Sequence, residues 1–147
     1  MSAASASYAG DIDVTAAWTL LETDARATLV DVRTRAEWTF VGLPDLAGLD
    51  KTPVLIEWQV WPAMDRRADF AADLAGELER RGVRHGDPVL FLCRSGARSQ
   101  SAAIALTERG YSACYNVAGG FEGGLDAERH RGTLSGWKAS GLPWVQS

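Results

Sequence analysis

Cysteine and histidine are scarce in this chain of 147 residues, with two of each. Two cysteines cannot form the disulfide framework of a small secreted domain, so both thiols are expected to be reduced. The four residues show no metal-ligand spacing, and His85 and His130 lie in charged turns that indicate surface positions. The sequence therefore predicts neither a metal site nor a cofactor.

The chain also lacks an excess of positive charge and any long apolar run. Its formal net charge is −4 with 23% charged residues, which offers no general attraction to nucleic acid or anionic lipid. No apolar run could cross a bilayer, and residues 1–10 have neither the basic nor the apolar region of a signal peptide. We therefore expect a soluble cytoplasmic protein without nucleic-acid or membrane partners.

Size and hydrophobic content fit a single domain. A chain of 147 residues with 46% hydrophobic residues can bury one sizeable core. Residues 1–11 are mostly small and polar, rich in alanine and serine, and they predict a flexible lead-in. The folded domain is expected to span residues 12–147.

Strand-like and helix-like segments alternate along this domain. The expected strands are short apolar or β-branched runs at 28–32, 54–57, 88–92 and 114–117. The expected helices have apolar residues at helical spacing, at 15–22, 66–81 and 99–109. Such alternation is typical of an α/β fold, with a mostly parallel central sheet and helices on both faces.

The segment with chemical content is Cys93 and the polar loop that follows it. Because the apolar strand at 88–92 runs directly into Cys93, the thiol is expected at the carboxyl end of a parallel strand. Open α/β sheets bind their ligands at this edge. Gly96 gives the loop the freedom to turn its backbone N–H groups toward the sulfur.

Three effects favour the thiolate of Cys93 over the thiol. They are the inward backbone amides, the positive end of the dipole of the following helix, and the guanidinium groups of Arg94 and Arg98. The alternative is an inert cysteine packed as a small hydrophobe. Two neighbouring arginines and a glycine are an unusual environment for such a residue. Cys93 is therefore predicted to be a nucleophile.

Three motifs resemble those of single-domain rhodaneses and occur in the order of that family. The specific one is the loop CRSGARS at 93–99, which resembles the active-site loop. The others are DVR at 31–33 with EW at 37–38, which resembles an early strand and turn, and NVAGGF at 116–121, which resembles the strand and glycine turn after the catalytic helix.

The resemblance implies a rhodanese-like three-layer fold and a sulfurtransferase. Cys93 would accept sulfane sulfur from a small anionic donor such as thiosulfate, hold it as a persulfide, and pass it to cyanide, a small thiol or a protein thiol. The implied substrate-binding residues are those of the loop: Arg94, Ser95, Gly96, Ala97, Arg98 and Ser99.

Two features depart from the family pattern. Many rhodaneses have a His-Ile-Pro-Gly type turn after the Glu-Trp pair, whereas residues 39–44 read Thr-Phe-Val-Gly-Leu-Pro, so access to the site is expected to differ. Ser95 resembles mercaptopyruvate-using relatives more than thiosulfate-using ones, which have a basic residue there. Those mercaptopyruvate relatives have glycine at the position of Arg94, so neither donor assignment transfers cleanly.

Rival functions remain beside this interpretation. Cysteine-dependent phosphatases and arsenate reductases separate the cysteine from the arginine by five residues, because a tetrahedral oxyanion must fit in the loop. Four residues separate Cys93 from Arg98, and the smaller ring favours a single sulfur atom. A non-enzymatic interaction module commonly lacks the cysteine. A protein-to-protein sulfur relay is compatible with catalysis and stays open.

Asp31 and Arg33 are interpreted as supporting residues of the site. Both stand at the end of a predicted strand, where their side chains could line the cleft. An internal ion pair that fixes the loop is favoured over that alternative.

The second cysteine and two tryptophans leave alternatives open. Cys114 could be a resolving thiol for Cys93, but its place in an apolar strand favours a buried structural role. Trp58 or Trp61 could help to wall the substrate pocket, although core packing explains most tryptophans.

Overall fold

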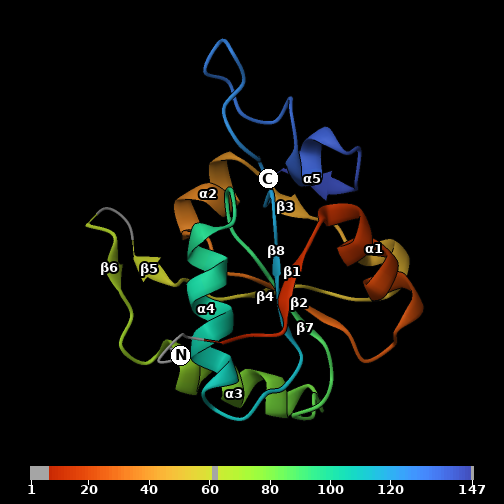
Figure 1. Cartoon of the computed structure of the whole chain (residues 1–147), viewed down its shortest axis with the longest axis vertical. Coiled ribbons are helices and arrows are strands. Elements are labelled where there is room, and N and C mark those ends of the chain that lie inside the picture. Colours follow the sequence, from red (N-terminus) through yellow and green to blue (C-terminus); the bar gives the residue numbers. More distant parts are fainter. Residues whose placement is uncertain (1–6, 61–62, 147) are drawn as a thin grey trace.

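A five-stranded parallel sheet forms the centre of the molecule, in the order β1-β8-β7-β2-β4 (Figure 1). The computed structural model describes residues 7–60 and 63–146. The strands of this sheet are β1 (Gly10–Ile12), β2 (Thr28–Asp31), β4 (Val54–Leu55), β7 (Val89–Leu92) and β8 (Cys114–Val117). The mostly parallel sheet expected from the sequence is therefore confirmed.

Helices and two small antiparallel pairs of strands surround the sheet. The helices are α1 (Val14–Thr23), α2 (Arg35–Phe40), α3 (Phe70–Arg80), α4 (Ala97–Thr107), α5 (Gly136–Ala139) and the 3-10 turn η1 (Ala47–Leu49). The pairs are β3 (Leu43–Pro44) with β9 (Trp144–Val145), and β5 (Gln59–Val60) with β6 (Asp65–Arg66). In Figure 1 the β5–β6 hairpin and the segment between β8 and α5 project from the body of the fold.

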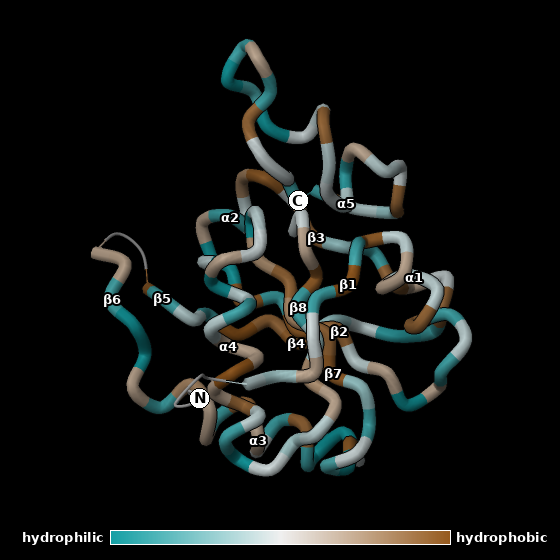
Figure 2. The backbone as a smooth tube through the Cα atoms, viewed as in Figure 1, coloured by the Kyte–Doolittle hydropathy of each residue, from teal (hydrophilic) through white to brown (hydrophobic). Residues whose placement is uncertain are grey.

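Alternate residues of the central strands pack into two hydrophobic clusters. On one face, Val89 and Phe91 of β7 pack in a cluster with side chains of α3 and α4. On the other face, Leu90 and Leu92 pack in a cluster with side chains of α1 and α5. Hydrophobic residues accordingly concentrate in the central strands (Figure 2). A continuous apolar run is what a strand buried on both faces requires, and helices cover both faces as expected.

The folded region begins before residue 12, which corrects the expected lead-in of residues 1–11. Gly10 and Asp11 belong to β1, which pairs with β8 at the edge of the sheet. Ala9 already donates its N–H to the carbonyl oxygen of Cys114 at 2.8 Å. A three-residue strand is too short to show an alternating pattern, so hydrophobic periodicity does not reveal it. Residues 1–6 lie outside the described residues.

Helix boundaries differ from expectation for local reasons. The first helix, expected from residue 15, begins at Val14 because the side chain of Asp13 caps it by accepting from the N–H of Ala16. The helix expected from residue 66 begins at Phe70, since Asp65–Arg66 pair with Gln59–Val60 instead. These are differences of cap and of tertiary pairing, which periodicity does not detect.

Helix α2 was not predicted, because six residues are too few to show helical periodicity. It is stabilised locally by a capping box, in which the Thr34 side chain accepts from the N–H of Glu37 and the Glu37 carboxylate accepts from the N–H of Thr34. Within residues 7–60 and 63–146, no helix is both long and apolar enough to traverse a bilayer.

Candidate active site

Cys93 directly follows β7, at the carboxyl edge of the parallel sheet. Its sulfur accepts a hydrogen bond from the backbone N–H of Gly96 at 3.1 Å, and the hydroxyl oxygen of Ser99 lies 3.2 Å away. The residue is 1% exposed, yet it lines a cavity of about 740 Å³. The thiol is therefore held by polar groups and borders the cavity.

Gly96 connects the cysteine loop to helix α4. It is the N-cap residue of that helix and has a φ of 119°, a conformation that side-chain-bearing residues rarely adopt. Since its N–H points at the sulfur of Cys93, the sulfur lies at the N-terminal end of an eleven-residue helix. The helix dipole favours negative charge at that end.

A turn that contains Gly119 and Gly120 follows β8 and contacts the backbone of the cysteine loop; it is called the glycine turn below. The N–H of Phe121 donates to the carbonyl oxygen of Cys93 at 2.8 Å, and the N–H of Glu122 donates to that of Arg94 at 3.0 Å. A Cβ atom on Gly120 would lie 2.5 Å from the Arg94 carbonyl oxygen and 2.6 Å from that of Cys93. The turn therefore needs glycine because two stretches of main chain touch there.

Arg98 of α4 is bound by Glu37 of α2 through two hydrogen bonds, of 2.7 and 3.0 Å. Burial raises the pKa of Glu37, but the hydrogen bonds from Arg98 and Thr34 and the charge of Arg98 outweigh burial. The net effect lowers the pKa from the ordinary 4.5 to about 2. Burial lowers the pKa of Arg98, and the hydrogen bond and charge of Glu37 raise it above its ordinary value. The guanidinium expected to face the substrate thus has a carboxylate partner that the sequence interpretation did not assign.

The remaining loop residues divide between the cavity wall and its floor. Arg94, Ser95 and Ala97 are exposed and line the cavity together with Cys93 and Arg98. The structure thus brings the predicted loop residues to one place, with Gly96 and Ser99 beneath the sulfur. Further lining residues come from distant segments: Thr34, Ala36, Glu37, Phe40, Val41, Gln59, Met64, Glu122 and Arg131.

Asp31 and Arg33 form an internal ion pair with both side chains fully buried. The Arg33 guanidinium donates to both carboxylate oxygens and, at 2.7 Å, to the carbonyl oxygen of Gly42. Its central carbon lies 4.2 Å from the ring centroid of Phe121, which belongs to the glycine turn. The ion pair favoured from the sequence is present, and it connects β2 to the turn that supports the cysteine loop.

Cys114 and Trp58 lie in the hydrophobic core. Burial raises the pKa of the Cys114 thiol to about 11, in keeping with the structural role favoured for it. Trp58 is 8% exposed and packs edge-on against Phe70 at 4.9 Å, so packing accounts for it. Trp61 lies outside the described residues.

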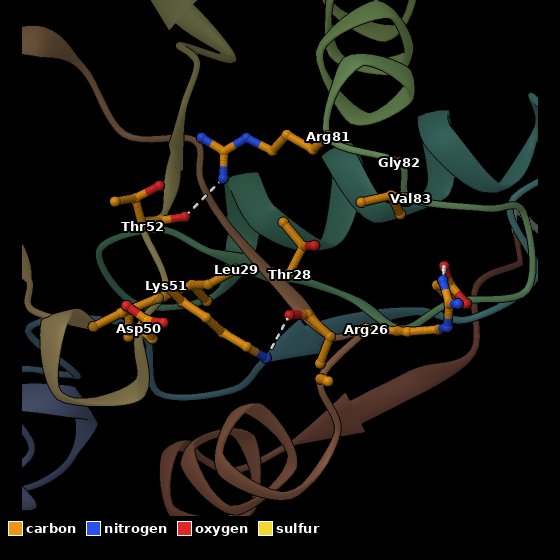
Figure 3. Close-up of a pocket in the computed structure, with 13 residues that line it drawn as sticks. Arg26, Thr28, Leu29, Asp50, Lys51, Thr52, Arg81, Gly82 and Val83 are labelled. Atoms are coloured by element: carbon orange, nitrogen blue, oxygen red, sulfur yellow. Dashed lines mark hydrogen bonds and ion pairs between the residues drawn. The ribbon is translucent and has the colours of Figure 1, made fainter.

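A second cavity, of about 290 Å³, opens near Thr28 at the amino end of β2, away from Cys93 (Figure 3). Its cations have protein partners. Lys51 donates to the carbonyl oxygens of Leu21, Asp24 and Ala27, each at 2.8 Å. Arg81 donates to the carbonyl oxygen of Thr52 at 2.7 Å. The third cation, Arg26, lies 3.7 Å from the carboxylate of Asp87.

The described part of the chain contains no group of three or more histidine, cysteine, aspartate or glutamate side chains placed to hold a metal ion. His85 and His130 are exposed.

Comparison with known proteins assigns a family. The family model described as "STR4 middle domain" matches residues 10–147. The chain belongs to the STR4 middle domain family. This family is rhodanese-like, and the fold described above agrees with that assignment.

Several proteins are similar to this member of the STR4 middle domain family over most of its length. The crystal structure of Rv0390 from M. tuberculosis is 49% identical, with a TM-score of 0.84 over 96% of this chain and 100% of that chain. The uncharacterized protein RC0915 of Rickettsia conorii is 37% identical over 130 residues, which cover 88% of this chain and 92% of that protein.

Two further relatives of this STR4 middle domain chain carry functional names. Rhodanese-like domain-containing protein 4, chloroplastic, of Arabidopsis thaliana is 27% identical over 88% of this chain and 24% of that protein. Thiosulfate sulfurtransferase GlpE of Actinobacillus pleuropneumoniae serotype 5b is 34% identical over 61 residues, which cover 42% of this chain and 44% of that protein. Sulfurtransferases therefore occur among the more distant relatives.

Proposed function

We propose that this chain is a sulfurtransferase in which Cys93 carries a sulfur atom as a persulfide. The observation that carries the proposal is the position of its sulfur, which accepts the N–H of Gly96 at the start of α4 and borders a cavity lined by Arg94. Such a position favours an anionic sulfur nucleophile. The thiosulfate sulfurtransferase among the relatives supports the same reaction class.

In the first step the Cys93 thiolate attacks the outer sulfur of a thiosulfate-like donor. A new bond forms between the cysteine sulfur and the outer sulfur, the S–S bond of the donor breaks, and sulfite leaves with the bonding electron pair. The product is a Cys93 persulfide carrying one negative charge. Arg94, which is exposed on the cavity wall, lowers the cost of bringing the anionic donor to an anionic nucleophile.

In the second step the acceptor attacks the terminal sulfur of the persulfide. With cyanide, the product is thiocyanate and the Cys93 thiolate is the leaving group. With a thiol, attack by its thiolate gives a new persulfide on the acceptor. The cysteine returns to its starting state in both cases, so the two displacements predict ping-pong kinetics.

The cavity allows an acceptor larger than cyanide. Its volume of about 740 Å³ is that of a pocket for an organic molecule, and Phe40, which is 76% exposed, stands on its wall. A small thiol or the cysteine of a partner protein is therefore an acceptor alongside cyanide.

The proposal places the protein in the cytoplasm, where thiols stay reduced, and both cysteines are free.

The rival activities make different demands on the same residues. A phosphatase would need the arginine after the cysteine to face a tetrahedral oxyanion, whereas Arg98 is engaged with Glu37 through two hydrogen bonds. An interaction module would have no use for a thiol hydrogen-bonded at a helix start. Release of phosphate from an aryl phosphate ester, lost in Cys93→Ser, would favour the phosphatase instead.

Removal of the thiol tests the proposal directly. We expect Cys93→Ala to abolish thiocyanate formation from thiosulfate and cyanide, because no other group on the cavity wall can form a persulfide. The intact mass of the wild-type protein is expected to increase by one sulfur atom after incubation with thiosulfate, and reductant is expected to remove that sulfur.

The matched control is Cys114→Ala, which removes the other thiol and is expected to retain sulfur uptake. Circular dichroism of both variants establishes that they are folded. Unchanged turnover in Cys93→Ala, or a sulfur atom retained by that variant, would refute Cys93 as the carrier.

A further inference from the structure

A chain of polar contacts runs from the edge strand β1 to the sulfur of Cys93. Asp11 and Asn116 are register partners on the neighbouring strands β1 and β8 (Figure 1), and Nδ2 of Asn116 donates to Oδ1 of Asp11 at 3.0 Å. Oδ1 of Asn116 lies 2.5 Å from the hydroxyl oxygen of Ser99, which lies 3.2 Å from the sulfur. Asn116 is 5% exposed and Ser99 is fully buried.

The hydroxyl of Ser99 has one proton and three acceptors within reach. These are the sulfur at 3.2 Å, the carbonyl oxygen of Gly96 at 3.2 Å and Oδ1 of Asn116 at 2.5 Å. Two oxygen atoms at 2.5 Å repel each other unless a proton lies between them. The proton of Ser99 therefore points to Asn116, and the sulfur faces a lone pair of the hydroxyl oxygen.

The orientation of the Asn116 amide depends on Asp11. A carboxylate has acceptors only, so it holds the NH2 group of the amide and leaves Oδ1 turned toward Ser99. If the amide were reversed, Oδ1 would face the carboxylate oxygen, and the NH2 group would donate to Ser99. The hydroxyl proton would then be free to point to the sulfur.

We infer that Asp11 is a positioning residue that acts through Asn116 to hold the hydroxyl proton of Ser99 away from Cys93. This inference rests on the proposed role of Cys93 as the nucleophile. In this arrangement Ser99 can accept a hydrogen bond from the S–H of the thiol and cannot donate one to the thiolate. It therefore opposes the N–H of Gly96, which donates to the sulfur.

Charged groups also act on the sulfur and have to be held constant in any test. Those that face the cavity beside it are Arg94, Arg98, Glu37, Glu122 and Arg131, and Asp31 of β2 interacts with Arg98. A substitution at Asn116 leaves all of these charges unchanged. It is therefore the cleaner probe of the hydroxyl proton.

The test is a double-mutant cycle on the pH dependence of alkylation of Cys93 by iodoacetamide. The adduct is measured on the peptide that contains Cys93, so that Cys114 does not contribute. We expect Asn116→Ala to move the midpoint about one pH unit lower, because Ser99 then donates to the thiolate; this corresponds to about tenfold faster alkylation well below the midpoint.

The cycle is completed by Ser99→Ala. In that background Asn116→Ala is expected to leave the midpoint unchanged, because no hydroxyl remains to reorient. An unchanged or higher midpoint in Asn116→Ala, or the same decrease with and without Ser99, would overturn the inference.

Asp11→Ala, at an exposed position, removes the acceptor that holds the Asn116 amide and provides a second variant if a change at Asn116 impairs folding. It is expected to lower the midpoint with Ser99 present and to lower it less in Ser99→Ala, where only the loss of charge acts. Glu22→Gln, which removes one negative charge from an exposed position on α1, is expected to leave the midpoint unchanged. Equal shifts for Asp11→Ala in both backgrounds would refute the role of Asp11.

Alkylation requires no sulfur donor, so the outcome is independent of sulfur transfer. If Cys93 takes up no sulfur from thiosulfate but the cycle shows the expected coupling, the proposed function fails and the positioning by Asp11 stands. If sulfur uptake is normal and the coupling is absent, the positioning fails alone.

Discussion

Glu37 and Arg98 form a charge pair at the wall of the Cys93 cavity, with side chains that are 18% and 16% exposed. Removing one partner of such a pair leaves a charge that water solvates poorly. The pair fixes the guanidinium in place beside the sulfur, and the capping box of α2 fixes the carboxylate. The position of the arginine therefore depends on a helix that is far away in the sequence.

Acid titration tests this pair. The pKa of Glu37 in the folded protein, about 2, lies below its ordinary value of 4.5. The ionised carboxylate therefore stabilises the fold fully above about pH 4.5, and this contribution is lost as the pH falls toward 2. We expect Glu37→Gln to lower the free energy of unfolding at pH 7 and to make its decline between pH 4.5 and 2 shallower, measured by urea denaturation.

Glu22→Gln is the control for this titration, because Glu22 is exposed on α1. It is expected to follow the wild-type stability curve. A Glu37→Gln curve parallel to that of the wild type across this pH range would contradict the assigned role of the pair.

At the scale of residues, the sequence predicts what is local and misses what folding brings together. Cys93, Gly96 and Ser99 could be assigned because they lie in one short loop with a recognisable pattern. Glu37 lies 61 positions from Arg98, and Asp11 lies 105 positions from Asn116. Glu37 was marked only as part of the EW motif at 37–38, with no role assigned to it, and no local pattern marked Asp11.

At the scale of elements, the glycine turn after β8 determines the shape of the cysteine loop. The main chain of the turn touches the main chain of the loop, with hydrogen bonds from Phe121 and Glu122 to the carbonyl oxygens of Cys93 and Arg94. Gly120 has a φ of 66° at this contact. The sequence identified the turn only as a motif, because a main-chain contact leaves no trace in hydrophobic periodicity.

We expect Gly120→Ala to destabilise the fold by roughly 2 kcal/mol or more, since the added methyl group would overlap two carbonyl oxygens in an unfavourable backbone conformation. Sulfur uptake from thiosulfate is expected to slow as the loop shifts. Thermal unfolding and the rate of mass gain measure the two effects.

Gly124→Ala provides the comparison, because a Cβ atom at Gly124 would have nothing within 4 Å. Its stability is expected to stay within about 0.5 kcal/mol of the wild type. If Gly120→Ala were as stable and as active as Gly124→Ala, the turn would not support the loop.

At the scale of the whole molecule, the two thiols lie near opposite ends of the neighbouring parallel strands β7 and β8. Cys114 is the register partner of Val89 at the start of β7, whereas Cys93 lies four residues further along. A strand rises about 3.3 Å per residue, so the two Cα atoms are roughly 13 Å apart or more. A disulfide spans at most about 7 Å between Cα atoms.

Oxidation with diamide is therefore expected to yield no intramolecular disulfide between Cys93 and Cys114. Peptide mapping without reductant checks this, with Cys114→Ala as the variant in which such a bond is impossible. A peptide that joins the two cysteines would contradict the observed register and restore the resolving-thiol role.

The global architecture was the most predictable level. Apolar runs that follow one another with intervening helices identify a parallel sheet, and this pattern is repeated often enough along the chain to be secure. The short elements β1, β3, β5, β6 and β9 span two or three residues each and depend on pairing with distant segments. The same holds for the site. Its cysteine loop is one local segment and could be predicted, whereas its cavity wall is built from distant segments and could not.

The cysteine loop is supported through its main chain, so the shape of the loop does not depend on the side chains that face the substrate. Because Phe121 and Glu122 bind carbonyl oxygens, they are indifferent to which side chains stand at positions 94, 95 and 97. Those three side chains are exposed toward the cavity. The scaffold is thus suited to engineering, in which libraries at these positions alter donor preference while the geometry around the sulfur stays constant.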